Sequence, residues 1–375
     1  MPDTVPLRCR HDTCMSTNDR ELKVSCSFVL SRLPPLGAQQ TLTHLASLPA
    51  ATDAIDVYGE GGAVAQLEAI TRQRLGKPSG LFFIKGVTAQ LCVLRALAEA
   101  RNCRNIVIHP LSHLGMDEAS AVERVAGLQS IRLGHHEPFT AAMLDTVTEP
   151  LAAVVVELPL RRAGYLLPDL DELRAISAWC RARDVPLHFD GARLWEAAAG
   201  YGVPEAELAT LADSVYVSYY KGLGGLGGAL VAGSEDFIRS LRVWKTRYGG
   251  DLFTAYPYAL AALDGLERRA PKLPACVARA RALAEALKPL SRVHVHPQRP
   301  DTNAFQIWLP GTPAALTERH RAFAAARGQW LFDRFGEAPL DGHAMAEIQI
   351  ENADDAGAND DAVEAIAAFL DFSRV

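Results

Sequence analysis

Short apolar runs alternate with helix-period stripes of apolar residues from about residue 56 to residue 235. Leu151–Val156 is a continuous apolar run of strand length, which predicts a strand buried on both faces of a parallel sheet. Val64, Leu67 and Ile70 recur at helical spacing and predict an amphipathic helix. Regular alternation of strands and helices is typical of an α/β fold with a mostly parallel sheet. Other strands are expected at 81–84, 105–108, 185–189 and 214–219, with helices at 63–75, 89–101, 170–183 and just after 233.

The pattern changes in the last third of the chain. A long helical stretch, interrupted by prolines, is followed by short strands and helices that predict a smaller α+β lobe. We therefore expect a large domain over residues 51–260 and a small C-terminal domain over 261–375. Residues 1–50 are mixed in character, and we expect them to pack on the small lobe or to be partly disordered. The expected strands of the small lobe are 293–295, 304–309 and 346–350, and its helices are 312–327 and 359–370.

Composition and charge narrow the range of partners. With 375 residues, 49% of them hydrophobic and 22% charged, the chain can bury one large core and a second, smaller one. A formal net charge of −6 offers no attraction for nucleic acid or anionic membranes. No apolar run approaches the roughly 20 residues of a membrane span. We therefore expect no nucleic-acid partner and no membrane partner.

Cysteine usage and the amino terminus indicate the compartment. Seven dispersed cysteines, and an amino terminus without the apolar core of a signal peptide, indicate a reducing cytoplasm. Cys9, His11 and Cys14 are conceivable metal ligands, but no second ligand pair follows them at zinc-like spacing. We therefore expect a cytoplasmic protein without a metal site, in which the first residues are disordered.

Two strand-like runs end in reactive side chains. Val185–Phe189 is followed by Asp190, and Ser214–Tyr219 is followed by Lys221 and the glycine-rich run Gly222–Gly228. The carboxyl ends of strands in one α/β sheet face the same crevice. A lysine and a carboxylate there suit pyridoxal 5′-phosphate (PLP), which bonds to a lysine as an aldimine and needs an acid at its ring nitrogen. The alternatives are a solvated lysine and a helix N-cap, or a structural ion pair in a protein that is not an enzyme.

These segments resemble a known family. The stretches LHFDGARLWEA, ADSVYVSYYKGLGGLGGALVAG and DVYGEGGAVAQLEAITRQRLGK are similar to those of the threonine aldolase and β-eliminating lyase family of fold-type I PLP enzymes, and looser similarity covers about residues 45–310. The resemblance implies an aminotransferase-like large domain with a seven-stranded, mostly parallel sheet. It also implies a carbon–carbon lyase that acts on a β-hydroxy amino acid of the L-threonine or L-allo-threonine type.

The resemblance also implies roles for individual residues. Lys221 would carry PLP and Asp190 would hold the ring nitrogen. His113 matches a histidine that stacks on the cofactor ring, although a loop histidine satisfied by backbone carbonyls is the alternative. Arg193 would hydrogen-bond the ring oxygen of the cofactor or a substrate carboxylate, unless it is a surface arginine paired with Glu196.

The strand at 81–84 is followed by a tight turn and a helix, where N–H groups and the helix dipole can hold a phosphate. Gly86, Val87 and Thr88 lie at this turn. The resembling family has a Ser-Gly-Thr type of sequence here, so the hydroxyl group is displaced by one place in this chain.

Two further residues are expected to contact the substrate. Tyr58 lies in the loop Asp56–Gly62, which belongs to the resembling stretch. Glu157 ends a strand at the active-site edge, where Leu158 replaces the amide that usually follows in the family.

The substrate carboxylate is where this chain departs from the family. Threonine aldolases of the family bind it with an arginine in a late strand of the small domain, helped by a serine near the amino terminus. In an ungapped placement His343 takes the place of that arginine, and an imidazole cannot offer the bidentate fork of a guanidinium. We therefore expect weak cleavage of threonine. Either His343, Arg193 or Arg32 would replace the arginine, or the substrate is not a simple α-amino acid.

The resemblance implies a small-molecule amino-acid substrate and a homodimer or homotetramer with shared active sites. Arg242, Lys245 and Arg247 match basic residues that approach the phosphate from a partner subunit, although a solvated basic helix face is the alternative. The reaction itself stays open between Cα–Cβ cleavage and β-elimination or another amino-acid transformation. The outcome depends on which bond lies perpendicular to the cofactor ring.

Overall fold

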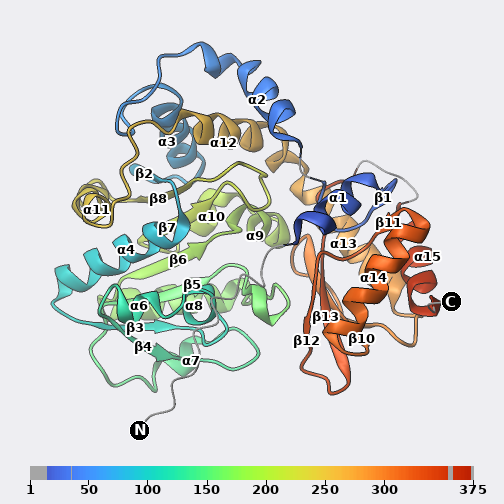
Figure 1. Ribbon diagram of the computed structural model, residues 1–375. Helices are drawn as coiled ribbons and strands as arrows, with labels where there is room; N and C mark the ends of the chain where they lie inside the picture. Colours follow the sequence, from blue (N-terminus) through green and yellow to red (C-terminus); the bar gives the residue numbers. More distant parts are fainter. Residues whose placement is uncertain (1–14, 35, 354–357, 373–375) are drawn as a thin grey trace, which may run out of the picture.

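The structure is a computed structural model that describes residues 15–34, 36–353 and 358–372. Two lobes make up the molecule (Figure 1), and segments from both ends of the chain meet in the smaller one. Cys9, His11 and Cys14 lie outside the described residues. No helix within the described ranges is long and apolar enough to cross a membrane.

Seven strands form the central sheet of the large lobe, in the order β2-β8-β7-β6-β5-β3-β4. Among them β8 alone runs antiparallel to its neighbours, and the other pairs within the described residues are parallel. This sheet confirms the α/β class and the mostly parallel seven-stranded arrangement. The strands are β2 (Ser79–Phe83), β3 (Asn105–Ile108), β4 (Gln129–Arg132), β5 (Ala153–Glu157), β6 (Leu187–Gly191), β7 (Ser214–Ser218) and β8 (Ala229–Gly233).

Helices cover both faces of this sheet. Val154 and Val156 of β5 lie in one buried cluster with residues of α3, α8, α9 and α12, whereas Val155 lies in another with residues of α4 and α11. Side chains alternate between the faces of a strand, so a continuous apolar run is what such burial requires. The helices of this lobe are α3 (Gly62–Arg74), α4 (Gly86–Arg101), α5 (His113–Met116), α6 (Ala121–Arg124), α7 (Ala141–Leu144), η3 (Arg161–Ala163), α8 (Leu170–Ala182), α9 (Leu194–Tyr201), α10 (Glu205–Ala209), α11 (Glu235–Arg247) and α12 (Tyr256–Arg268).

The small lobe is built on a four-stranded antiparallel sheet in the order β12-β13-β10-β9. A third buried cluster, which includes Phe305, Ile348 and Phe369, joins this sheet to its helices. The strands are β9 (His294–His296), β10 (Ala304–Pro310), β12 (Phe335–Glu337) and β13 (His343–Gln349). The helices are η4 (Ala270–Lys272), α13 (Leu273–Leu287), α14 (Pro313–Arg327) and α15 (Ala358–Asp371).

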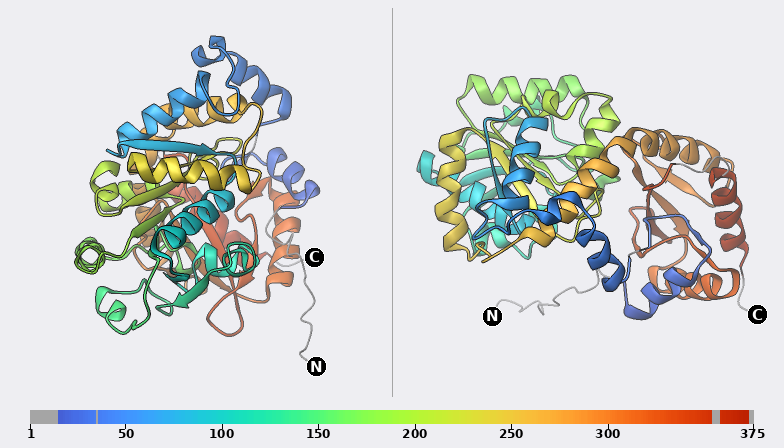
Figure 2. Two further views of the ribbon diagram at one scale, coloured as in Figure 1. Left: turned by 90° about the vertical axis from the view of Figure 1, so that its left-hand side faces the viewer. Right: turned by 90° about the horizontal axis from the view of Figure 1, so that it is seen from above.

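The N-terminal segment lies against both lobes (Figure 2). Its strand β1 (Phe28–Val29) pairs in parallel with β11 (Gln329–Trp330), and α1 (Thr17–Ser25) contacts α14 of the small lobe. Helix α2 (Ala38–Ala46) and the short helix η2 (Pro49–Thr52) follow, and α2 contacts α12 of the large lobe. This segment therefore crosses the boundary between the lobes.

The hydrophobic pattern of the sequence does not predict several of the strands. β4 is an edge strand with exposed and half-buried residues, so it carries no apolar run. β1 and β11 have two residues each, which is too short for any periodicity. β8 follows directly on the glycine-rich run and is antiparallel, which strand–helix alternation does not predict.

Candidate active site

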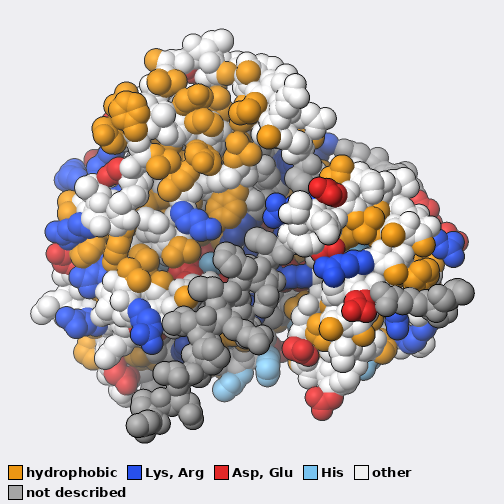
Figure 3. All heavy atoms as spheres, in the orientation of Figure 1, with side chains coloured by type: hydrophobic (Ala, Val, Ile, Leu, Met, Phe, Trp, Pro, Cys, Tyr) orange, Lys and Arg blue, Asp and Glu red, His pale blue; other side chains and the backbone are white. Residues whose placement is uncertain are grey.

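Three strands deliver the expected reactive residues to the carboxyl edge of the large sheet. Asp190 in β6 is paired in register with Glu157 in β5. Lys221 follows β7, the neighbour of β6 on its other side. A cavity of about 1300 Å³ lies at this edge, and Lys221 and Arg193 line it together with residues of the small lobe. Lysine and arginine side chains gather along the boundary between the lobes (Figure 3).

Close packing of the glycine-rich run fixes the backbone around Lys221. A Cβ atom at Gly222 would lie 2.0 Å from Glu196 Oε1. A Cβ atom at Gly225 would lie 2.8 Å from the carbonyl oxygen of Tyr219. Real side chains do not approach neighbouring atoms so closely. A larger residue at either position would therefore displace Glu196 or the backbone at Tyr219.

The electrostatic surroundings of Lys221 favour its neutral form. Burial of the amine, together with the positive charge of Arg193, lowers the pKa of Lys221 to about 8, although Asp190 and Glu157 oppose the shift. A lysine of lowered pKa has a larger fraction of free amine at neutral pH, and free amine is the form that attacks a carbonyl group.

Asp190 and Arg193 are both buried beside Lys221. Asp190 Oδ1 accepts a hydrogen bond of 3.2 Å from the N–H of Ala192. Within the described residues, Asp190 Oδ2 has no hydrogen-bond partner, and Arg193 Nε is buried without one. Because Arg193 is only 8% exposed, the alternative of a surface arginine is wrong.

His113 is held at the start of α5 by two carboxylates. Its backbone N–H donates to Glu157 Oε2 at 2.6 Å, and its ring nitrogen Nδ1 lies 2.8 Å from Glu118 Oε1. Burial opposes a charged imidazole, but the hydrogen bond to Glu118 and the negative charge of Asp190 prevail, so the pKa of His113 is raised. The contact with Glu118 leaves Nε2 as the ring nitrogen available to a ligand.

Glu157 holds two loops in place. Its Oε2 binds the N–H of His113, and its Oε1 accepts the N–H of Arg161 at 3.2 Å. Burial and the neighbouring charge of Asp190 raise the pKa of Glu157 to about 7. Both oxygens therefore have backbone partners, and the expected contact of Glu157 with substrate stays a prediction.

Gly86, Val87 and Thr88 form the first turn of α4. The residue before them, Lys85, makes no capping hydrogen bond with its side chain, so the side chain leaves the first N–H groups of the helix uncapped. A Cβ atom at Gly86 would lie 2.1 Å from Tyr216 Oη, so glycine is required where the helix passes β7. The turn retains the uncapped helix start that can hold a phosphate.

Tyr58 and His343 are not among the described residues that line the cavity. Tyr58 is 59% exposed, has a φ of 51° and packs edge-on against Phe253. His343 begins β13, with Nδ1 3.0 Å from the carbonyl oxygen of Asp341 and its ring 5.2 Å from that of His294. The substrate-binding roles expected for Tyr58 and His343 therefore stay predictions without a supporting contact in this structure.

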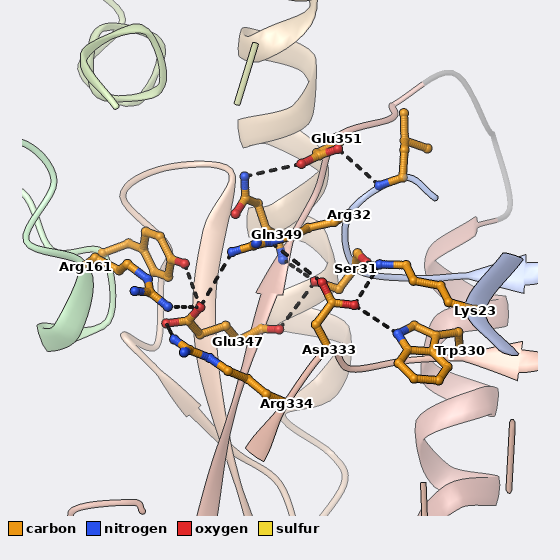
Figure 4. Close-up of polar contacts among 12 residues, drawn as sticks. Lys23, Ser31, Arg32, Arg161, Trp330, Asp333, Arg334, Glu347, Gln349 and Glu351 are labelled. Carbon is orange, nitrogen blue, oxygen red and sulfur yellow. Dashed lines mark hydrogen bonds and ion pairs between the residues drawn. The ribbon is translucent and has the colours of Figure 1, made fainter. Parts of the chain in front are cut away.

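The cavity has a second polar wall, shown in Figure 4. Glu347 of β13 accepts hydrogen bonds from Arg161 Nη2 at 2.9 Å and from Tyr165 Oη at 3.0 Å. Arg32 and Arg334 each place a guanidinium nitrogen near the same carboxylate, at 3.9 and 3.5 Å. We call these five residues the Glu347 cluster.

Within the Glu347 cluster, Arg32 alone is expected from the sequence to contact the substrate. Two signals could have identified others. Arg161 lies four residues beyond Glu157, at the same functional edge of the sheet. Glu347 lies between Ala346 and Ile348, which are fully buried, and strand alternation sends its side chain to the opposite face.

The residues at the sheet edge fit PLP on the chemistry of their free groups. Asp190 Oδ2 can accept from a ring N–H, and the amine of Lys221 can bond to an aldehyde. Arg193 Nε and Ser218 Oγ are buried with no partner among the residues that the structure describes, and both can donate to anionic or phenolic oxygens. The uncapped start of α4 suits a phosphate.

Comparisons with known proteins agree with this chemistry. The family of beta-eliminating lyases matches residues 44–309. Aldolase vrtJ of Penicillium aethiopicum is 30% identical over 275 residues, which cover 71% of this chain and 69% of that protein. Low-specificity L-threonine aldolase 1 of Arabidopsis thaliana is 26% identical over 259 residues, which cover 66% of this chain and 72% of the relative.

A solved structure extends the match to nearly the whole chain. A protein of Listeria monocytogenes, provisionally assigned as an L-allo-threonine aldolase, is 31% identical with a TM-score of 0.87, and the match covers 94% of this chain and 98% of that one. The matched family and the fold-type I relatives are PLP-dependent enzymes. This chain belongs to the beta-eliminating lyase family and is a threonine aldolase-like lyase.

Proposed function

We propose that this protein is a PLP-dependent lyase that cleaves the Cα–Cβ bond of a β-hydroxy amino acid of the L-threonine or L-allo-threonine type. The observation that carries this proposal is the meeting of Lys221, Asp190 and His113 at one sheet edge, beside a cavity that can admit an amino acid. The aldolase names of the relatives support the same choice of substrate.

Four parts of the chain would hold the cofactor. Lys221 would bond to its aldehyde, Asp190 would accept from its ring nitrogen, and Arg193 would contact its ring oxygen or a substrate carboxylate. The turn at Gly86 would bind its phosphate through the first N–H groups of α4. When bound, PLP supplies an electron sink next to the substrate Cα, which is the chemistry that a cleaved Cα–Cβ bond requires.

His113 would accept the proton of the substrate hydroxyl group. Cleavage of a β-hydroxy amino acid to an aldehyde releases that proton, so a base near Cβ is needed. The contact between Nδ1 and Glu118 fixes the ring and raises the pKa of His113, which strengthens Nε2 as a proton acceptor. Glu157 holds the backbone of the same residue from the other side.

The second candidate is a PLP-dependent β-eliminating lyase on the same fold. The observation that favours it is the late strand β13, which brings Glu347 rather than an arginine to the cavity wall. Release of an aldehyde from β-hydroxy amino acids supports aldol cleavage, whereas release of a 2-oxo acid with ammonia supports elimination.

We also propose that the protein is a homodimer or homotetramer with shared active sites. The loops at Asp56 and Ala255 are tied together, because the buried carboxylate of Asp56 accepts the N–H groups of Gly59 and Ala255. Exposed apolar side chains gather on these loops and support a protein interface: Ile55, Val57, Tyr58, Leu252, Phe253 and Tyr256. Phe253→Asp should lower the molar mass measured by light scattering, and an unchanged mass would contradict this interface.

Trapping of the cofactor tests the catalytic proposal. Borohydride treatment of the protein loaded with PLP should leave a reduced adduct on Lys221, identified by peptide mass spectrometry. Lys221→Ala should abolish both the adduct and amino-acid cleavage, while Lys85→Ala, the matched control, should keep the adduct. An adduct that maps to Lys85 or Lys245 would overturn the assignment.

A further inference from the structure

The cavity between the lobes is positively charged in a protein that is negatively charged overall. Its lining contains nine arginine and lysine side chains against five aspartate and glutamate side chains, whereas the whole chain has a net charge of −6. A cleft lined by a surplus of one sign attracts ligands of the opposite sign. The cavity is therefore built to receive an anion.

Arg161 lines this cavity with a guanidinium whose hydrogen-bonding capacity is only partly used. It follows Glu157 at the carboxyl edge of the large sheet, and the Glu157 carboxylate binds its backbone N–H. Its side chain is 18% exposed. Its guanidinium donates from Nη2 to Glu347 Oε2 at 2.9 Å, and the hydroxyl of Tyr165 is a further neighbour. A guanidinium has five N–H donors, and Nε of Arg161 is buried without a partner in the described part of the chain.

Arg32 approaches the same place from the N-terminal segment. Its nearest contacts are ion pairs of 3.9 Å with Asp333 and with Glu347, which are longer than hydrogen bonds. It has a φ of 57°, a conformation that is strained for arginine. Its N–H donates to the carbonyl oxygen of Gln349 at 3.0 Å, so β13 holds the strained backbone.

One carboxylate does not satisfy the Glu347 cluster. Arg32, Arg161 and Arg334 face the charge of Glu347, and Arg32 also pairs with Asp333, which in turn binds Lys23. Four positive charges thus meet two negative ones, so two positive charges remain uncompensated. Buried or half-buried cations of this kind normally have an anionic partner. Arg193 adds another buried guanidinium nearby, stacked at 5.3 Å over the ring of Tyr165.

We infer that Arg161, assisted by Arg32, is the binding site for the carboxylate of the amino-acid substrate. This inference rests on the proposed function, because the substrate amine would meet the cofactor held by Lys221 in the same cavity. Both guanidinium groups line the same cavity as Lys221, and the charge of Arg161 acts on that lysine. A guanidinium offers a carboxylate two parallel hydrogen bonds, which fixes the orientation of the substrate.

Glu347 is a positioning residue in this arrangement. It binds Arg161 and Tyr165 through one oxygen, Oε2, and its other oxygen lies 3.5 Å from Arg334. It thereby turns the guanidinium of Arg161 toward the cavity and joins the small lobe to the large one.

Two amines that differ in the carboxylate test the inference. The holoenzyme is titrated with glycine, and separately with ethanolamine, while the visible absorption of the cofactor is followed. Arg161→Met should weaken glycine binding roughly 10- to 100-fold, the effect of losing charge-assisted hydrogen bonds, and leave ethanolamine binding unchanged. Arg161→Lys, which keeps the charge but loses the fork, should fall between Arg161→Met and the unaltered protein.

Arg162 provides a matched control beside Arg161. It pairs with Asp117 through two hydrogen bonds and does not line the cavity. Arg162→Met should leave both titrations unchanged. The inference is wrong if Arg161→Met binds glycine as the unaltered protein does, or if it weakens both amines equally. Failure of the unaltered protein to develop a visible band with PLP would instead overturn the proposed function.

The positioning role of Glu347 has its own test. Glu347→Ala should weaken glycine binding and spare ethanolamine binding, because Arg161 loses its anchor. Glu347→Gln keeps an oxygen acceptor and should restore glycine binding. If the glutamine variant binds glycine as poorly as the alanine variant does, the role as an acceptor for Arg161 is wrong.

Discussion

The two walls of the cavity are built in different ways. On the large-lobe wall, Lys221 follows the end of β7, and the buried Asp190 lies at the end of the neighbouring strand β6. Backbone N–H groups or closely packed glycines hold their surroundings. On the second wall, the Glu347 cluster joins the N-terminal segment, the loop after β5 and the small lobe. Side chains make nearly all of its contacts.

This difference in construction suits two different tasks, namely the reaction itself and the recognition of the substrate. Groups that must react need fixed positions, and strand ends in a hydrogen-bonded sheet provide them. Groups that recognise a substrate can come from long side chains on separate segments, each of which can change without disturbing the sheet. We therefore expect substitutions on the large-lobe wall to act on turnover and those on the second wall to act on substrate affinity.

Asp190→Asn, at the carboxyl edge of the large sheet, should have the largest effect on activity. The amide cannot provide the negative charge that stabilises a protonated ring nitrogen, so kcat for amino-acid cleavage should fall about 10²- to 10³-fold. Steady-state kinetics with saturating PLP would measure the loss. Near-full turnover in this variant would contradict the role of Asp190.

Asp333→Ala should damage the second wall without touching the sheet edge. It leaves the ammonium of Lys23, whose side chain is 3% exposed, without its partner at 2.7 Å. Breaking a buried pair in this way should cost about 3 kcal/mol in the free energy of unfolding, measured in urea.

The double variant Lys23→Met/Asp333→Leu is the control for that loss, because it removes both charges and should recover most of the stability. PLP uptake should stay normal in both proteins. A single variant as stable as the unaltered protein would refute the anchoring role of Asp333.

Uptake of PLP by the apoprotein should depend on pH through Lys221. Burial and Arg193 destabilise the ammonium form, so the amine loses its proton near pH 8 rather than near 10.5. The uptake rate should rise about tenfold per pH unit below pH 8 and level off above it. Arg193→Met removes a positive charge and should move the midpoint upward. A midpoint near 10.5 in the unaltered protein would contradict the lowered pKa.

Arg32→Met should have the smallest effect. Its side chain is 40% exposed and its ion pairs are long, so glycine binding should weaken only about two- to fivefold. Titration of the holoenzyme measures this change, with ethanolamine as the control ligand. A loss larger than that of Arg161→Met would reverse the order of the two arginines.

Sequence patterns predict the two walls unequally. The apolar run of β5 and the strand before Asp190 identify the parallel sheet, and strand ends in such a sheet have a known common direction. Lys221 and Asp190 could therefore be proposed as site residues without coordinates, from the local sequence and its resemblance to the family.

The second wall depends on contacts that no local pattern encodes. Arg161 and Glu347 are 186 positions apart, and the register of β13 against β10 decides which of its residues reaches the cavity. An ungapped placement selected His343, which starts the strand, whereas Glu347 lies four residues further along the same face. Side-chain contacts across such distances follow from the folded arrangement of the lobes.

The contact between Lys23 and Asp333, 310 positions apart, has a consequence for synthesis on the ribosome. The N-terminal segment is synthesised before the large lobe, whereas its strand partner β11 and its charge partner are synthesised after that lobe. Domains generally fold as units during translation, so the large sheet can form while this segment waits unpaired. A chain that ended before Asp333 would contain Asp190 and Lys221 but would lack Arg334 and Glu347 of the Glu347 cluster.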